Sequence, residues 1–166
     1  MPFVSAIRSN PLQDGRQSER AMVVRRGVQR LLSTFGAAML PEITLAGGRR
    51  ADLMALTPKG DIWIVEIKSS IEDFRVDRKW PEYRLHCDRF FFATHPDVPA
   101  SIFPEEAGFI LSDGYGAEIM RDAPEHRLAP HARKALMLRL ARAGAARLLA
   151  AELAGVPVPA LEGESE

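Results

Sequence analysis

The chain has only one cysteine, Cys87, among 166 residues, which excludes an internal disulfide and a cysteine-rich zinc site. No apolar run approaches the roughly 20 residues that a membrane-spanning helix needs. The N-terminus lacks the basic segment and apolar core of a secretory signal. We therefore expect a cytoplasmic protein with no membrane partner, in which Cys87 is a small buried apolar side chain.

The chain also lacks net charge, because 22 Lys and Arg residues balance 22 Asp and Glu residues. This balance excludes nucleic-acid binding that depends on overall positive charge, so any such site must come from local clustering. Arginines do cluster in the first expected helix, and glutamates cluster at the C-terminal end. These groups are Arg16, Arg20, Arg25, Arg26 and Arg30, and Glu162, Glu164 and Glu166.

Length and composition indicate one ordinary globular domain. Hydrophobic residues make up 46% of the chain and charged residues 27%, which is enough apolar surface for a real core. We divide the chain into a flexible N-terminal arm (residues 1–16), a single domain (residues 17–154) and a flexible acidic tail (residues 155–166).

Hydrophobic periodicity predicts alternating helices and strands. An amphipathic helix begins after a Ser18 N-cap and ends near Gly36. The remaining expected elements are strands at 43–46, 50–57 and 62–69, a mostly helical segment at 72–88 with either a break at Pro81 or a helix starting there, a strand at 89–94, two strands at 108–112 and 117–120, and a helix at 131–153. This order predicts an α/β layer arrangement around a central sheet. The last helix is rich in Ala and Leu and is compatible either with covering the sheet or with pairing with a second copy.

Three charged residues interrupt the apolar strands at 50–57 and 62–69. Asp52 lies in the first of them, and Glu66 and Lys68 lie on one face of the second. Burying an unpaired charge costs several kcal/mol, so these residues indicate a catalytic centre, a structural Glu–Lys ion pair, or a strand whose polar face is exposed to water.

The length of the hairpin loop decides whether Asp52 joins Glu66. Paired residues of antiparallel strands have a constant index sum and share a face of the sheet. A two-residue loop at 59–60 gives a sum of 119 and sends Asp52 to the opposite face, whereas a three-residue loop at 58–60 gives 118 and places it across from Glu66. A catalytic pair therefore requires an odd loop or a bulge.

If the carboxylates converge, they form a site for Mg²⁺ or Mn²⁺, which prefer hard oxygen ligands. Asp52, Glu66 and the backbone carbonyl of Ile67 would hold the metal. Lys68 would hold the attacking water or screen a phosphate, and the metal would acidify that water. This donor set is suited to hydrolysis of a phosphodiester.

The Asp52…Glu66-x-Lys68 trio resembles the signature of the PD-(D/E)XK nuclease superfamily. The words GRRADLMAL and WIVEIKSSIEDFRVDRKWPEY are similar, more closely, to the MmcB family of bacterial DNA repair proteins within it. The resemblance covers about residues 18–149. It implies a restriction-endonuclease-like αβββαβ core, a central mixed sheet flanked by helices, with an extra hairpin and a long C-terminal helix. It also implies a role in DNA repair or damage tolerance.

The chain departs from the superfamily pattern at the first helix, where many members carry a metal-binding Glu. The candidates here are Glu19, near the start of that helix, and Glu42, before the first expected strand. Some DNA-processing members also have a Gln-x-x-x-Tyr motif, which reads Lys79-x-x-x-Tyr83 here. Arg49, Arg50, Lys79 and Tyr83 are the residues we expect to contact DNA, because Arg and Lys position a phosphate backbone.

Two functional hypotheses follow. The first is a metal-dependent deoxyribonuclease acting on damaged, branched or single-stranded DNA. The second is a non-catalytic module that keeps the fold to bind DNA or to dock the components of a repair (translesion) polymerase assembly. An intact trio favours the first hypothesis, and the missing helix glutamate favours the second.

Overall fold

A computed structural model describes residues 18–157 of the chain. The predicted arm (1–16) and the end of the predicted tail, beyond residue 157, lie outside the described residues. The elements, in order, are α1 (Glu19–Thr34), β1 (Ala38–Thr44), β2 (Arg50–Leu56), β3 (Ile62–Ile67), α2 (Ile71–Val76), the 3₁₀ helix η1 (Trp80–His86), β4 (Arg89–Thr94), the 3₁₀ helix η2 (Ala100–Ile102), β5 (Gly108–Ser112), β6 (Ala117–Arg121) and α3 (Pro130–Leu153).

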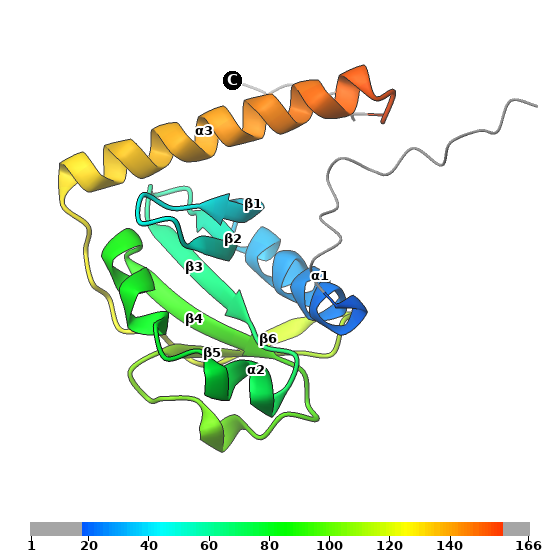
Figure 1. Cartoon of the computed structure of the whole chain (residues 1–166), viewed down its shortest axis with the longest axis vertical. Helices are drawn as coiled ribbons and strands as arrows, with labels where there is room; N and C mark the ends of the chain where they lie inside the picture. Colours follow the sequence, from blue (N-terminus) through cyan, green and yellow to red (C-terminus); the bar gives the residue numbers. More distant parts are fainter. Residues whose placement is uncertain (1–17, 158–166) are drawn as a thin grey trace, which may run out of the picture.

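Six strands form one mixed sheet in the order β1-β2-β3-β4-β5-β6. The first three strands are antiparallel, β3, β4 and β5 are parallel, and β5 and β6 form an antiparallel hairpin. The chain crosses from β3 to β4 through α2 and η1 (Figure 1). The predicted αβββαβ core, extra hairpin and long C-terminal helix are confirmed.

Each face of the sheet has its own apolar core. On one face, α1 packs Val24, Val28 and Leu32 against the sheet. On the other, α2, η1, η2 and α3 surround an aromatic cluster built on Phe90 and Phe92 of β4. Because both faces are covered, the strands at the centre of the sheet are apolar on both sides, which explains the near-continuous hydrophobic run of β3.

Helix α1 begins where the sequence predicts. The Ser18 hydroxyl accepts the backbone N–H of Ala21, which satisfies one of the amides that every helix start leaves unpaired. The helix is oriented with this N-terminal end beside the end of β3 that carries Glu66 and Lys68, since Ser18 and Ala21 line the same pocket as those residues.

Two predicted elements differ from the structure. Strand β1 spans Ala38–Thr44, earlier than the expected 43–46, because Pro41 is tolerated at the edge of a sheet. Its regular geometry is interrupted at Glu42, whose φ of 54° is in the left-handed region. The segment at 72–88 has only one short α-helix, but a second helix does start beside Pro81, as one of the two predicted alternatives has it: Pro81 lies in the first turn of the 3₁₀ helix η1. Among the described residues, no helix is long and apolar enough to cross a membrane.

Candidate active site

The β2–β3 hairpin has a three-residue loop. Leu53 pairs with Val65 and Leu56 with Ile62, so the index sum is 118. Thr57 donates its N–H to the carbonyl of Asp61, and Gly60 donates to Thr57, which leaves residues 58–60 as the loop. Gly60 has a φ of 89°, the left-handed conformation that closes three-residue hairpins. The odd loop places Asp52 across from Glu66.

Side-chain hydrogen bonds continue the pairing of β2 and β3 beyond the last ladder pair, Leu53 and Val65. The backbone N–H of Asp52 donates to Oε1 of Glu66 at 2.9 Å. The N–H of Ile67 donates to Oδ2 of Asp52 at 2.8 Å. Each carboxylate therefore binds the backbone of the opposite strand. This reciprocal arrangement fixes both acids side by side without a metal.

Glu66 is 4% exposed, and burial raises the pKa of its carboxyl well above the ordinary value. The neighbouring charge of Asp52 raises the pKa further, while the Asp52 N–H and the Lys68 ammonium act in the opposite direction. Two carboxylates held close together repel each other, and the repulsion is stronger where one of them is buried, as Glu66 is. A cation that binds between them would relieve this repulsion.

Lys68 lies just after β3, and its ammonium donates to Oδ2 of Asp77 at 2.7 Å. Both side chains are largely buried. The other oxygen of Asp77 accepts the N–H of Lys79, so the segment after α2 holds Asp77 in place. Sequence reasoning did not single out Asp77, because it lies in a segment with many charges and no distinctive spacing.

Arg25 is a second residue that the sequence analysis placed only within a basic cluster. It projects from α1, is 7% exposed, and is electrostatically coupled to both Glu42 and Asp52. Burial lowers the pKa of its guanidinium, and these two carboxylates partly offset that effect. The first helix thus brings a cation to Asp52, where many members of the resembled superfamily bring a carboxylate.

The two candidates for a further acidic ligand lie outside the cluster. Glu42 is 3.7 Å from Arg50, and Arg147 of α3 donates to the carbonyls of Pro41 and Glu42. Glu19 is exposed in the first turn of α1. Neither side chain lines the pocket that contains Asp52 and Glu66.

The residues expected to contact DNA fall into two groups. Arg49 and Arg50 line the pocket, and Arg49 donates to Glu82 at 2.5 Å while its guanidinium lies over the Tyr83 ring. Tyr83 is buried, donates its hydroxyl to the carbonyl of Arg50, and stacks on Phe90. Lys79 is exposed and does not line the pocket.

These residues surround an open cavity of about 640 Å³ at the C-terminal end of β3, where the strand's arrowhead points towards α2 (Figure 1). Acidic and basic groups share its wall, which is formed by α1, β2, β3, α2 and η1. Within residues 18–157, no three His, Cys, Asp or Glu side chains form a group that could hold a metal by themselves. A divalent cation would therefore depend on two carboxylates, supplemented by water, carbonyl or phosphate oxygens.

The order and pairing of the helices and strands are those of a mixed α/β domain with the predicted restriction-endonuclease-like αβββαβ core. The chain belongs to the MmcB-like family, described as DNA repair protein MmcB-like, whose model matches residues 8–155. A solved structure of SPO1766, a protein of unknown function from Silicibacter pomeroyi, is similar to this chain, with 41% sequence identity and a TM-score of 0.78. The similarity covers 88% of this chain and 99% of the other. Among curated proteins, none matches the chain.

Proposed function

We propose that the chain binds DNA at the Asp52–Glu66 cavity and hydrolyses a phosphodiester bond there with the help of Mg²⁺ or Mn²⁺. Membership of a DNA repair family supports DNA as the partner. One observation supports hydrolysis: the carboxylates of Asp52 and Glu66 are held as a pair, because each accepts a hydrogen bond from the backbone of the other's strand.

The donor set fits a hard divalent cation. Asp52 and Glu66 supply carboxylate oxygens, and the carbonyl of Ile67, which lines the same cavity, is the candidate third protein ligand. Such a cation, when bound, would acidify a water and neutralise charge on the phosphate. A cation bound there would favour the ionised form of Glu66 and so oppose the burial and the Asp52 charge that raise its pKa.

The basic residues would position the substrate. Arg49 and Arg50 stand at the start of β2 beside the carboxylates, where their side chains would bind phosphates on either side of the scissile bond. Each now has an acidic partner, Glu82 or Glu42, which DNA phosphates would replace. Lys68 would hold the attacking water, and Asp77 keeps its ammonium at the cavity wall.

A second candidate function is a module that binds branched or single-stranded DNA, or docks repair polymerase components, without cleaving DNA. The observation that favours it is Arg25, a buried cation coupled to Asp52. The positive charge of Arg25 acts on Asp52 and weakens the attraction of the site for a second positive charge.

Calorimetric titration with Mn²⁺ separates the two functions. We expect saturable binding by the wild type and none by Asp52→Asn, which keeps the shape but removes the charge. Asp122→Asn is the matched control, because that carboxylate is exposed and pairs with Arg89 at the opposite end of the parallel strands. Equal binding by wild type and Asp52→Asn would exclude the proposed ligand.

Cleavage of labelled DNA completes the test. Single-stranded, nicked and branched DNA should be incubated with Mg²⁺, and only the wild type and Asp122→Asn should cut. Binding of DNA by the wild type together with no cleavage of any of these DNAs would support the non-catalytic module.

A further inference from the structure

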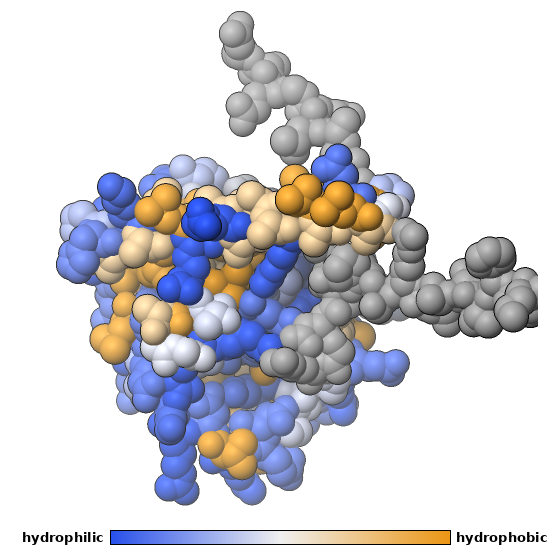
Figure 2. Space-filling model, turned by 45° about the horizontal axis from the view of Figure 1, so that its top comes forward, coloured by the Kyte–Doolittle hydropathy of each residue, from blue (hydrophilic) through white to orange (hydrophobic). Residues whose placement is uncertain are grey.

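Helix α3 has an apolar face on each side. Its inner face packs on the sheet through Leu136 and Leu140, which are buried. On its outer face, Leu138 is 55% exposed and Leu148 is 51% exposed. Figure 2 shows apolar side chains along the length of this helix, with the largest group near its C-terminal end. Exposing several leucines on one surface helix is unfavourable for a monomer.

Six of the exposed residues of α3 follow a regular repeat. They lie at alternating steps of four and three residues, which places them on one line along a helix. We call this line the outer stripe. Its members are Lys134, Leu138, Ala141, Ala145, Leu148 and Glu152, all of them exposed.

The outer stripe is complementary to itself when it is reversed. Residue numbers that face each other in an antiparallel pair have a constant sum. That sum is 286 for Lys134 and Glu152, for Leu138 and Leu148, and for Ala141 and Ala145. Two antiparallel copies would therefore set Lys134 against Glu152, Leu138 against Leu148, and Ala141 against Ala145. A two-fold interface requires this reciprocity, and opposite charges at its ends fix the register.

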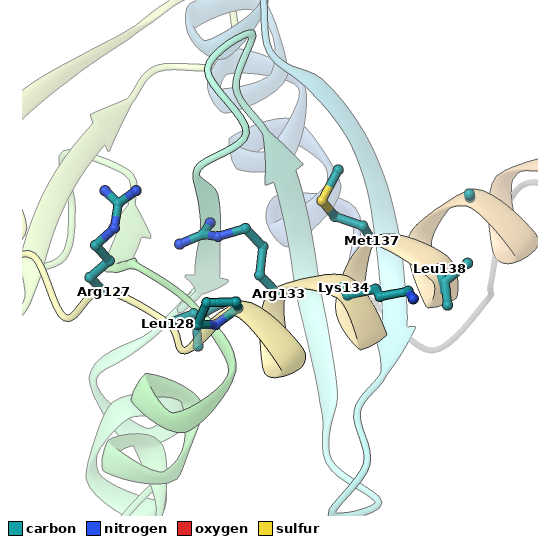
Figure 3. Close-up of a pocket in the computed structure, with 8 residues that line it drawn as sticks. Arg127, Leu128, Arg133, Lys134, Met137 and Leu138 are labelled. Carbon is teal, nitrogen blue, oxygen red and sulfur yellow. The ribbon is translucent and has the colours of Figure 1, made fainter.

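A groove beside the outer stripe offers space for the opposing leucines. It has a volume of about 690 Å³ and is lined by Leu128, Met137, Leu138 and Ala141, together with Arg133 and Lys134. Figure 3 shows Met137, Leu138 and Lys134 projecting from neighbouring turns of α3. In the reversed register, Leu148 of a second copy lies against Leu138, at the edge of this groove.

We propose that α3 is a dimerisation surface that pairs antiparallel with α3 of a second copy of this chain, through the outer stripe. The small side chains of Ala141 and Ala145 at the centre let the two helices approach closely. Arg142 flanks the stripe, and its long side chain can reach water past the contact. The proposal does not depend on catalysis at the Asp52–Glu66 cavity.

A single pair of helices buries less than the roughly 800 Å² per partner of a standard interface, so we expect a reversible dimer. Sedimentation equilibrium from low to high micromolar concentration should show wild-type mass rising from one chain to two. Ala145→Glu should raise the dissociation constant about tenfold or more, because it buries like charges at the centre. Ala150→Glu, the same substitution on a side of α3 turned away from the stripe, should leave it unchanged.

Charge exchange tests the register. Lys134→Glu alone and Glu152→Lys alone should each weaken the dimer about fivefold, since each creates two like-charge pairs. The double variant should restore it, and so should an equimolar mixture of the two single variants. Circular dichroism checks that every variant is folded. A wild type that stays monomeric, or a dimer that Ala145→Glu does not weaken, would overturn the proposal.

Discussion

Replacing Glu66 by Gln should stabilise the protein when no divalent cation is present. The variant keeps the side-chain oxygen that accepts the Asp52 N–H, and it removes a negative charge that is 4% exposed and faces Asp52. Leaving a buried carboxylate imperfectly compensated costs about 1–3 kcal/mol after its hydrogen bond and the nearby Lys68 ammonium are considered. The melting temperature should rise by about 2–4 °C for each kcal/mol gained.

The gain must depend on pH, because it comes from a raised pKa. Below the pKa of an unfolded Glu, about 4.3, Glu66 is protonated in both states, and wild type and variant should have similar stability. As the pH rises above that value, Glu66 loses its proton in the unfolded chain but keeps it in the folded chain. The wild type then loses about 1.4 kcal/mol per pH unit relative to Glu66→Gln, until the pH passes the folded pKa.

Thermal and denaturant unfolding between pH 4 and 9 in a chelator would measure this difference. Adding Mn²⁺ should reverse the order, because a cation at a concentration about 1,000 times its dissociation constant stabilises the wild type by about 4.1 kcal/mol and the variant hardly at all. Glu118→Gln, at an exposed position of β6, is the control and should follow the wild type. A Glu66→Gln variant that is less stable than the wild type at every pH, with no trend, would show that the buried Glu66 charge does not destabilise the fold.

Three further predictions concern the sheet, its helices and the site. Asp88 accepts the N–H groups of Ile62 and Leu128 and both nitrogens of Arg133, so Asp88→Ala should destabilise the fold by about 3–5 kcal/mol in urea unfolding; a loss below 1 kcal/mol would contradict this role. Gly27→Ala should cost about 2–4 kcal/mol, because its Cβ would lie 2.0 Å from Ser112 Oγ and 2.7 Å from the Gly116 carbonyl, whereas Gly144→Ala, with 3.4 Å of room beside Leu40, should be neutral or stabilising. Lys68→Met should abolish cleavage in the DNA assay while Mn²⁺ binding persists in calorimetry, and undiminished cleavage would remove Lys68 from the chemistry.

The sequence was most informative where local chemistry alone determines structure. Ser18 capped the first helix as expected, and strand β4 matched its predicted bounds at residues 89–94. The alternation of side chains along β3 predicted which of its residues share a face of the sheet. The residue across from Glu66 could not be predicted in this way, because adding or removing one residue in the hairpin loop changes the face on which Asp52 lies. Gly60 was the available signal, since a glycine that ends a Pro-Lys-Gly loop is suited to the left-handed position of a three-residue hairpin.

Other features depend on tertiary contacts that no local pattern reveals. The bend of β1 at Glu42 is supported by Arg147, 105 residues away. The pairing of Lys68 with Asp77 requires the chain to turn back after α2. Arg25 belongs to an arginine cluster that is typical of a solvated helix face, and only the packing of α1 buries it where its charge acts on Asp52.

In the proposed function, Asp52 and Glu66 together hold one divalent cation. Anomalous diffraction from crystals soaked in Mn²⁺ would locate that cation. We predict a single anomalous peak between the two carboxylates, within coordination distance of the Ile67 carbonyl, and its loss in Asp52→Asn crystals. Well-ordered wild-type crystals with no peak in this cavity at saturating Mn²⁺ would contradict the claim.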